Sequence, residues 1–322
     1  MKKFKFFALA ALFGMSINAM ATEVTVKYSA NGVDYNVTYD GTTPVKAVVL
    51  GLTTGNTTAT SVTIPATITP TGTGADENIS DKEFEVKEIA ADAFYLKSTL
   101  TTVTINGTKL TTVGGRAFQG TAITTITLPT SVTTIGQGAF KNTQLSSFTW
   151  APTSNSTIAD SAFVNTKLTS FTIPAKVTAI GADKGYVFAE SANLATLTVA
   201  ASSVLTTLKA NIIKGTAITQ LDLSPAAANL TQGNIADKAF SSEALQKVIF
   251  YTKSGSTITQ NSNITTIADG WFEESYALQE VVFPTSVTTI EAKAFQNCVL
   301  TTLDLSKSTT AVTLANIFDL YG

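Results

Sequence analysis

The apolar residues of this chain recur in a pattern that repeats every 22 to 32 residues over most of its length. Each repeat contains one large apolar anchor, usually the second residue of an Ala-Phe pair. The nine anchors are Phe94, Phe118, Phe140, Phe163, Phe188, Ile213, Phe240, Phe272 and Phe295. A regular period of this length indicates a repeat architecture, in which each unit is one supersecondary element.

Each repeat contains two short segments that are predicted to be extended. Five or six residues after an anchor comes a block of the form apolar-x-x-apolar-x-apolar, as in Leu100–Ile105, Ile123–Leu128 and Leu168–Ile173. Its alternation of Thr with β-branched or aromatic residues is typical of a strand that buries one face. A second segment precedes the anchor, as in Val132–Phe140 and Val287–Phe295, and leads into a turn or short helix that places the Phe in the core.

A single unit of this size cannot bury its apolar face, whereas stacked units bury a continuous core. The fold class predicted is therefore a β-rich (α/β-type) repeat solenoid, a curved array with a parallel β-sheet on its concave face. We expect three parts: a signal peptide over residues 1–21, a short β-rich N-terminal cap over 22–60, and a solenoid of about nine to ten units over 61–322.

The N-terminus has the pattern of a secretory signal peptide. Three Lys stand among the first five residues, a mostly apolar run covers residues 6–17, and Ala19-Met20-Ala21 supplies a small-x-small cleavage site. The alternative is a short N-terminal membrane anchor, although the run is too short to span a bilayer comfortably. No later stretch reaches the ~18 apolar residues of a span, so we expect no transmembrane segment in the mature chain. The prediction is a secreted or cell-surface protein.

Composition excludes several kinds of chemistry. Thr makes up roughly 18 % of the chain, whereas His is absent and Cys298 and Arg116 are single residues of their kind. Without His there is no Ser-His-Asp or Cys-His relay and no imidazole metal ligand. The predicted mature chain has 18 basic and 23 acidic residues, which argues against nucleic acid as a partner. We expect no catalytic residues, no metal and no cofactor.

The repeat signature Leu-x-x-Leu-x-Leu-Pro followed by Val-x-x-Ile-x-x-x-Ala-Phe resembles the BspA-type leucine-rich repeat family of bacterial surface and secreted proteins. The resemblance covers roughly residues 60–307. It implies an adhesion role, in which the chain binds host matrix proteins, other bacteria or glycans, and it brings no catalytic motif. Cys298 occupies a repeat slot that holds Thr in other units, such as Thr121 and Thr143, so we expect it to be a small core residue.

In each strand block the two residues that flank the middle apolar position point away from the core. In the first five units these positions hold only Ser and Thr, from Thr102 and Thr104 to Thr196 and Thr198, but later units mix charged and apolar groups. The candidate partner-binding residues are Gln220, Asp222, Lys247, Ile249, Tyr251, Glu280, Val282 and Asp304. A protein or glycan at a surface is the expected ligand, and an inert face produced by repeat drift is the alternative.

The sequence is also compatible with other functions. The chain could be a structural surface-layer component without a specific ligand, and its regular Thr rows resemble the faces of ice-binding solenoids. A polysaccharide-active enzyme needs converging carboxylates, for which Asp269, Glu273 and Glu274 form the best local group. For glycan stacking the sequence offers two Trp: Trp150 occupies a core slot and should be buried, whereas Trp271 precedes an anchor and could be exposed.

Overall fold

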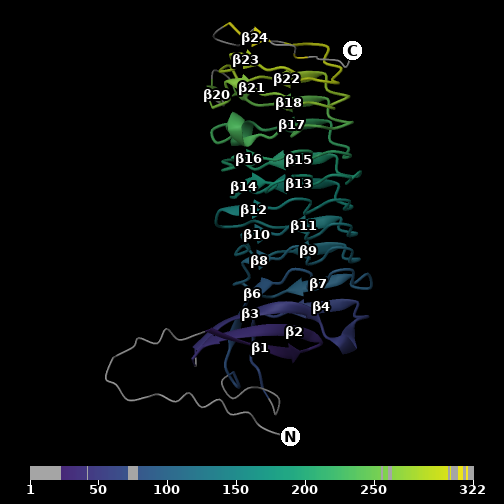
Figure 1. The fold of residues 1–322 in the computed structure, drawn as a ribbon, viewed down its shortest axis with the longest axis vertical. Coiled ribbons are helices and arrows are strands. Elements are labelled where there is room, and N and C mark those ends of the chain that lie inside the picture. The colour runs from purple at the N-terminus through teal and green to yellow at the C-terminus, as the bar shows by residue number, and fades with distance from the viewer. Residues whose placement is uncertain are drawn as a thin grey trace, which may run out of the picture.

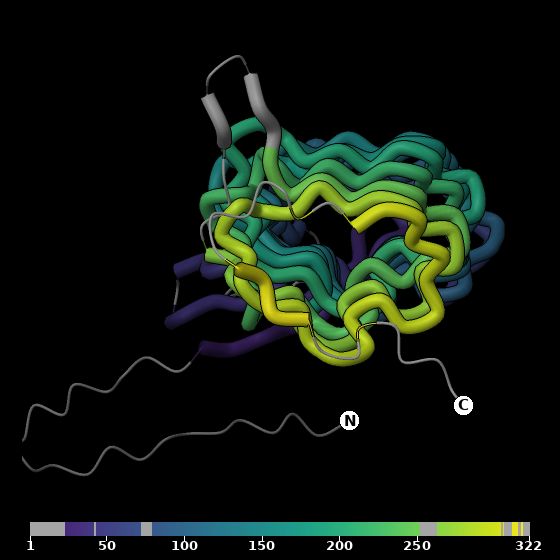
Figure 2. Tube along the Cα trace, turned by 90° about the horizontal axis from the view of Figure 1, so that it is seen from above, coloured from purple at the N-terminus to yellow at the C-terminus, as the bar shows by residue number. Residues whose placement is uncertain are grey.

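The computed structural model describes residues 23–41, 43–71, 79–254, 257–259, 263–303, 305, 311–314 and 317. The predicted signal peptide and the candidate residue Asp304 lie outside these ranges. Within them the chain forms a column of stacked turns that runs from the N-terminal to the C-terminal end (Figure 1). Seen from above, successive turns overlie one another (Figure 2). No helix in the described part of the chain is long and apolar enough to cross a membrane.

The N-terminal end of the column is an antiparallel meander of β1 (Glu23–Ala30), β2 (Val33–Asp40) and β3 (Thr43–Leu52). Asn31 and Gly32 connect β1 to β2 with φ angles of 51° and 75°. Both residues therefore have the positive φ that a two-residue hairpin turn requires, and Asn-Gly is the sequence that best tolerates it. β3 then pairs in parallel with β6 (Phe84–Ile89), which joins this end to the repeats.

The apolar-x-x-apolar-x-apolar blocks form one strand per unit. They are β4 (Ser61–Ile64), β7 (Thr102–Ile105), β9 (Thr125–Thr127), β11 (Ser147–Thr149), β13 (Ser170–Ile173), β15 (Thr196–Val199), β17 (Gln220–Asp222), β18 (Lys247–Ile249) and β22 (Glu280–Val282). We call their outer side the Leu-strand face. These strands were expected to form one continuous parallel sheet, but they pair only in groups: β4–β7, β9–β11, β13–β15 and β17–β18–β22.

The shorter segment before each anchor forms the longer sheet. β6 is followed by β8 (Thr112–Val113), β10 (Thr134–Ile135), β12 (Ser156–Ile158), β14 (Val177–Ile180) and β16 (Thr207–Leu208), all in parallel. A second group continues the stack with β21 (Thr266–Ile267), β23 (Thr289–Ile290) and β24 (Thr313–Leu314). The two groups are separated where the turns carry the 3-10 helices η2 (Ser224–Ala226) and η3 (Gln232–Asn234).

Four short elements lie outside this pattern. The 3-10 helix η1 (Thr54–Asn56) follows the N-terminal meander, and β5 (Thr67–Ile68) pairs antiparallel with β6. β19 (Thr252–Ser254) and β20 (Thr257–Thr259) form an antiparallel hairpin. This hairpin accounts for the longest interval between anchors, from Phe240 to Phe272.

The anchors form the corner of the column. The backbone N–H of one anchor donates to the next unit, for example from Phe118 to the Ala139 carbonyl at 2.8 Å. The rings of Phe94, Phe118, Phe140, Phe163 and Phe188 stack with centroid distances of 5.3 to 5.5 Å. Ile213 interrupts this stack, which resumes from Phe240 to Phe272 and Phe295 at 5.0 Å. All nine anchors are fully buried. Their stacked side chains form the continuous core that was expected from the sequence.

Candidate binding surface

Strand register brings the sequence-predicted residues of three units together on the Leu-strand face. The pairing of β17, β18 and β22 aligns Gln220 with Lys247 and Glu280 in one row, and Asp222 with Ile249 and Val282 in a second row. Tyr251 follows β18 and is partly exposed. We call these seven residues the mixed patch. Charged and apolar side chains therefore lie side by side over adjacent strands, as the repeat alignment predicts.

The other half of the Leu-strand face carries no charge at the same positions. Its outward residues are Ser61, Thr63, Thr102, Thr104, Thr125, Thr127, Ser147, Thr149, Ser170, Thr172, Thr196 and Thr198, and all of them are exposed. A cross-strand contact joins the hydroxyls of Thr172 and Thr198 at 2.8 Å. We call this set the hydroxyl rows. The change from hydroxyls to mixed chemistry falls between β15 and β17, where the strand pairing is also interrupted.

Three members of the mixed patch have polar partners within the chain. Lys247 Nζ lies 2.9 Å from Glu280 Oε1, and their side chains remain 32 % and 50 % exposed. An ion pair this open adds at most about 1 kcal/mol to stability, so both charges are available to a partner at little cost. Asp222 Oδ1 accepts a hydrogen bond of 2.9 Å from the Ser224 N–H, which fixes the start of η2. Asp222 therefore has a structural role as well as a surface position.

A groove of about 390 Å³ adjoins the mixed patch at its C-terminal side. Tyr251, Glu280 and Val282 line it together with Phe283, Pro284 and Leu305. Sequence reasoning missed the last three, because Phe283 and Leu305 occupy slots that normally face the core. The Phe283-Pro284 step was the available signal, since Pro often ends these strands. The groove joins an apolar floor to a carboxylate and a phenol, which suits a side chain of a protein partner.

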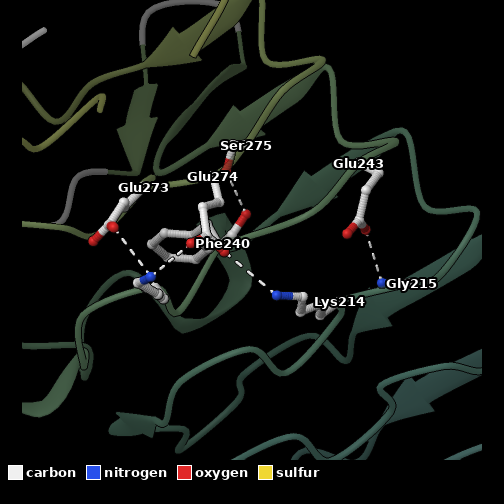
Figure 3. Close-up of polar contacts among 8 residues, drawn as sticks. Lys214, Gly215, Phe240, Glu243, Glu273, Glu274 and Ser275 are labelled. Atoms are coloured by element: carbon white, nitrogen blue, oxygen red, sulfur yellow. Dashed lines mark hydrogen bonds and ion pairs between the residues drawn. The ribbon is translucent and has the colours of Figure 1, made fainter. Parts of the chain in front are cut away.

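Two of the three carboxylates near Phe272, those of Glu273 and Glu274, form ion pairs with lysines from preceding units. Figure 3 shows Glu274 facing Lys214. Lys238 Nζ lies 3.0 Å from Glu273 Oε1 and 2.8 Å from Glu274 Oε1, and Lys214 Nζ lies 3.4 Å from Glu274 Oε2. The Lys238 hydrogen bond outweighs partial burial and lowers the pKa of Glu274, while Glu274 raises the pKa of Lys238. The lowered pKa keeps Glu274 ionised, so it is not set up as the protonated acid of a glycosidase pair.

Replacing Glu274 with Gln is expected to lower the free energy of unfolding at pH 7 by about 1 kcal/mol, because it removes the anion between Lys238 and Lys214. The pKa of Glu274 is lower in the folded state than in the unfolded state. Its contribution to stability is therefore present above the unfolded-state pKa of about 4.3 and is lost as the pH falls through the folded-state pKa. Urea unfolding at pH 7 and pH 3 measures both effects. Glu280→Gln, in the single open ion pair with Lys247, is the matched control and should change stability less; an equal effect contradicts the role of the network.

Trp271, which the sequence left open to exposure, is not exposed. Its side chain is fully buried, with ring centroids 6.3 Å from Phe240 and 6.2 Å from Phe250. The slot before the anchor holds Ala in most units and faces inward, so a Trp there fills core volume rather than reaching solvent. Trp150 is buried as expected, and its indole N–H donates to the Val132 carbonyl at 3.1 Å. Neither indole presents an open face for stacking.

Cys298 has the environment of a structural residue. Its Sγ lies 3.0 Å from the Phe272 carbonyl, to which the thiol donates, and the side chain packs against the core. Burial raises the pKa of this thiol to about 12, so it is protonated at neutral pH and is a poor nucleophile. Among the residues that the structure describes, no three His, Cys, Asp or Glu side chains come together as a metal site.

These features define a leucine-rich repeat solenoid with a chemically varied outer strand face. The family model for the BspA type leucine rich repeat region matches in six copies, over residues 75–194, 156–261 and 243–319. The match spans well over half of the sequence, and the chain belongs to this family. The resemblance and the fold class expected from the sequence are therefore confirmed.

Solved structures of bacterial leucine-rich repeat proteins resemble the chain at low identity. The pneumococcal vaccine antigen PcpA is 17 % identical, with 87 % of this chain and 75 % of PcpA covered and a TM-score of 0.48. A leucine rich cell surface protein from Faecalibacterium prausnitzii is 18 % identical, with coverages of 92 % and 95 % and a TM-score of 0.37. A leucine-rich repeat protein from Bacteroides ovatus is 16 % identical, with coverages of 84 % and 81 % and a TM-score of 0.39. No curated protein matches the chain.

Proposed function

We propose that this chain is an exported binding module that attaches to a protein partner through the mixed patch and its adjoining groove. The observation that carries the proposal is the alignment of Lys247, Glu280, Ile249 and Val282 on two paired strands beside an apolar groove. Recognition surfaces combine an apolar centre with charged groups that orient the partner. The hydroxyl rows on the same face offer no such contrast.

Export is the second part of the proposal. It is supported by the cationic start, short apolar run and Ala-Met-Ala pattern of residues 1–21, and by membership of a repeat family with a cell-surface relative. We propose that a β-rich cap over 22–60 and a solenoid over 61–322 form the exported part. Mass spectrometry of the protein recovered from the cell exterior tests this; a chain that keeps Met1 contradicts cleavage after Ala21.

The triple variant Lys247→Ala, Tyr251→Ala and Glu280→Ala is expected to weaken partner binding at least tenfold. It removes the paired charges and the aromatic wall of the groove without touching a buried anchor. Biolayer interferometry against a panel of immobilised extracellular-matrix proteins and whole bacterial cells measures the loss.

The matched control changes three residues of the hydroxyl rows, Thr102, Thr104 and Thr125, to Ala on the same face. This control should bind as the unaltered protein does. Equal binding by both variants would place recognition elsewhere. An absence of binding to every member of the panel would favour a structural surface component instead.

A further inference from the structure

A second opening on the Leu-strand face lies between β11 and β13, within the hydroxyl rows. β11 pairs with β9 and β13 pairs with β15, but β11 and β13 form no ladder with each other. The gap is a cleft of about 270 Å³. Its two strands precede β17 of the mixed patch by three and two units, and it shares no lining residue with the groove described above.

Two aromatic residues in successive units lie beneath this gap. The middle apolar slot of the strand block holds Val, Ile or Leu in the other units, as at Val103, Ile126 and Leu197, but Phe148 and Phe171 fill it in these two. Their rings stack at 5.7 Å, and both contact Phe163, at 4.9 and 5.2 Å. The strand pairing is also interrupted between β7 and β9 and between β15 and β17, but there the middle slot is aliphatic, so this gap differs in having rings beneath it.

The cleft combines an aromatic floor with a neutral, hydroxyl-bearing rim. Its lining consists of Phe148, Trp150 and Phe171 on the inside and Thr149, Ser170 and Thr172 at the edge. Phe148 is partly exposed, whereas its counterparts Val103 and Ile126 are buried. The three rim residues are exposed. None of the lining residues is charged, and the outward positions of the neighbouring strands also hold only Ser and Thr.

We propose that this cleft binds one sugar ring of a neutral polysaccharide. An aromatic ring beside hydroxyl donors and acceptors matches a pyranose, which has an apolar C–H face and a rim of hydroxyl groups. An anionic sugar would lose hydration without gaining a cation, because the lining and the neighbouring strand face are uncharged. Sites for drug-sized ligands have volumes of about 300–1,000 Å³. The cleft is slightly smaller, so it fits a single sugar ring and the rest of the polymer lies outside it.

Affinity electrophoresis of the full chain tests the proposal with neutral probes (laminarin, dextran, mannan and xylan) and acidic probes (heparin and polygalacturonate). At least one neutral polymer should retard the protein, and the acidic polymers should not. Ser170→Asp places a charge at the rim and should weaken retention at least tenfold. Thr102→Asp places the same charge at the equivalent exposed position of β7, away from the cleft, and should leave retention unchanged.

Phe148→Leu gives a second, independent variant, because it removes the exposed ring while keeping an apolar residue in the slot. It should weaken retention at least fivefold in protein whose circular dichroism matches the unaltered chain. The triple variant of the mixed patch should be retained normally, which separates this site from the proposed protein-binding surface. The proposal is overturned if no neutral polymer retards the protein, if only acidic polymers do, or if Ser170→Asp and Thr102→Asp behave alike.

Discussion

Replacing Phe163 with Ala is expected to lower the free energy of unfolding by about 3–5 kcal/mol, the range for truncating a fully buried Phe. Phe163 lies at the centre of the anchor stack, with Phe140 and Phe188 on its two sides at 5.4 and 5.5 Å. Its edge also meets Phe148 and Phe171. Truncation leaves a cavity that the four neighbouring rings cannot fill, because each of them is held by contacts with other rings. Urea unfolding followed by circular dichroism measures the loss.

Two further variants test whether the loss of stability comes from the cavity or from any change of side chain in the anchor stack. Phe163→Leu keeps most of the volume and should cost about 1–1.5 kcal/mol. Ile213 shows that the slot accepts an aliphatic residue, since it is fully buried at the same position of its own unit. Ile213→Ala removes fewer atoms and should cost about 2–4 kcal/mol. A Phe163→Ala variant that loses less stability than Ile213→Ala would show that the corner collapses to fill the space.

The spacing of the anchors was enough to predict the stacked core, because each unit repeats the same turn and so places its Phe above the previous one. The outward positions were also predictable, since a strand alternates its side chains and the register repeats from unit to unit. The relative extent of the two sheets was not. Both segments alternate Thr with β-branched residues, so their pattern does not indicate that the short strands from β6 to β16 form the longer ladder.

What the sequence could not predict depends on contacts between units. The ion pairs of Lys238 join residues that are 35 and 36 positions apart, across units whose lengths differ. The groove beside the mixed patch brings Tyr251 and Glu280 together with Phe283 and Leu305, which belong to different units. The cleft at Phe148 lies where two aromatics fill the same slot of successive units and where β11 and β13 form no ladder, and the repeat pattern does not indicate which strands pair.

Asp160 illustrates how one side chain compensates for a change in unit length. The interval from the last core residue of the short strand to the anchor is five residues in the other units, as from Ile135 to Phe140, but eight from Ile180 to Phe188. The three extra residues form a loop whose successive N–H groups point at the carboxylate of Asp160 in the previous unit. The donors are Ala182, Asp183, Lys184 and Gly185, at 2.8 to 3.1 Å.

This arrangement places an anion in a nest of backbone donors. Asp160 is only 6 % exposed. Burial alone would raise the pKa of its carboxyl group, but the four backbone hydrogen bonds outweigh burial and hold the pKa below its usual value. The depressed pKa means that the folded state favours the ionised form. The carboxylate therefore stabilises the fold above the unfolded pKa of about 3.9, and the contribution is lost as the pH falls through the folded value.

Asp160→Ala is expected to lower the free energy of unfolding at pH 7 by about 2–4 kcal/mol, because it leaves the loop N–H groups without their acceptor. Asp160→Asn keeps the shape but only one good acceptor oxygen, and should lose about 1–2 kcal/mol. The difference between the unaltered chain and Asp160→Asn should be constant from pH 7 to pH 5 and should shrink below about pH 4. Asp183→Asn, at an exposed side chain of the same loop, is the control. A stability gap that persists unchanged to pH 2.5 would show that the charge of Asp160 contributes nothing and that only its shape matters.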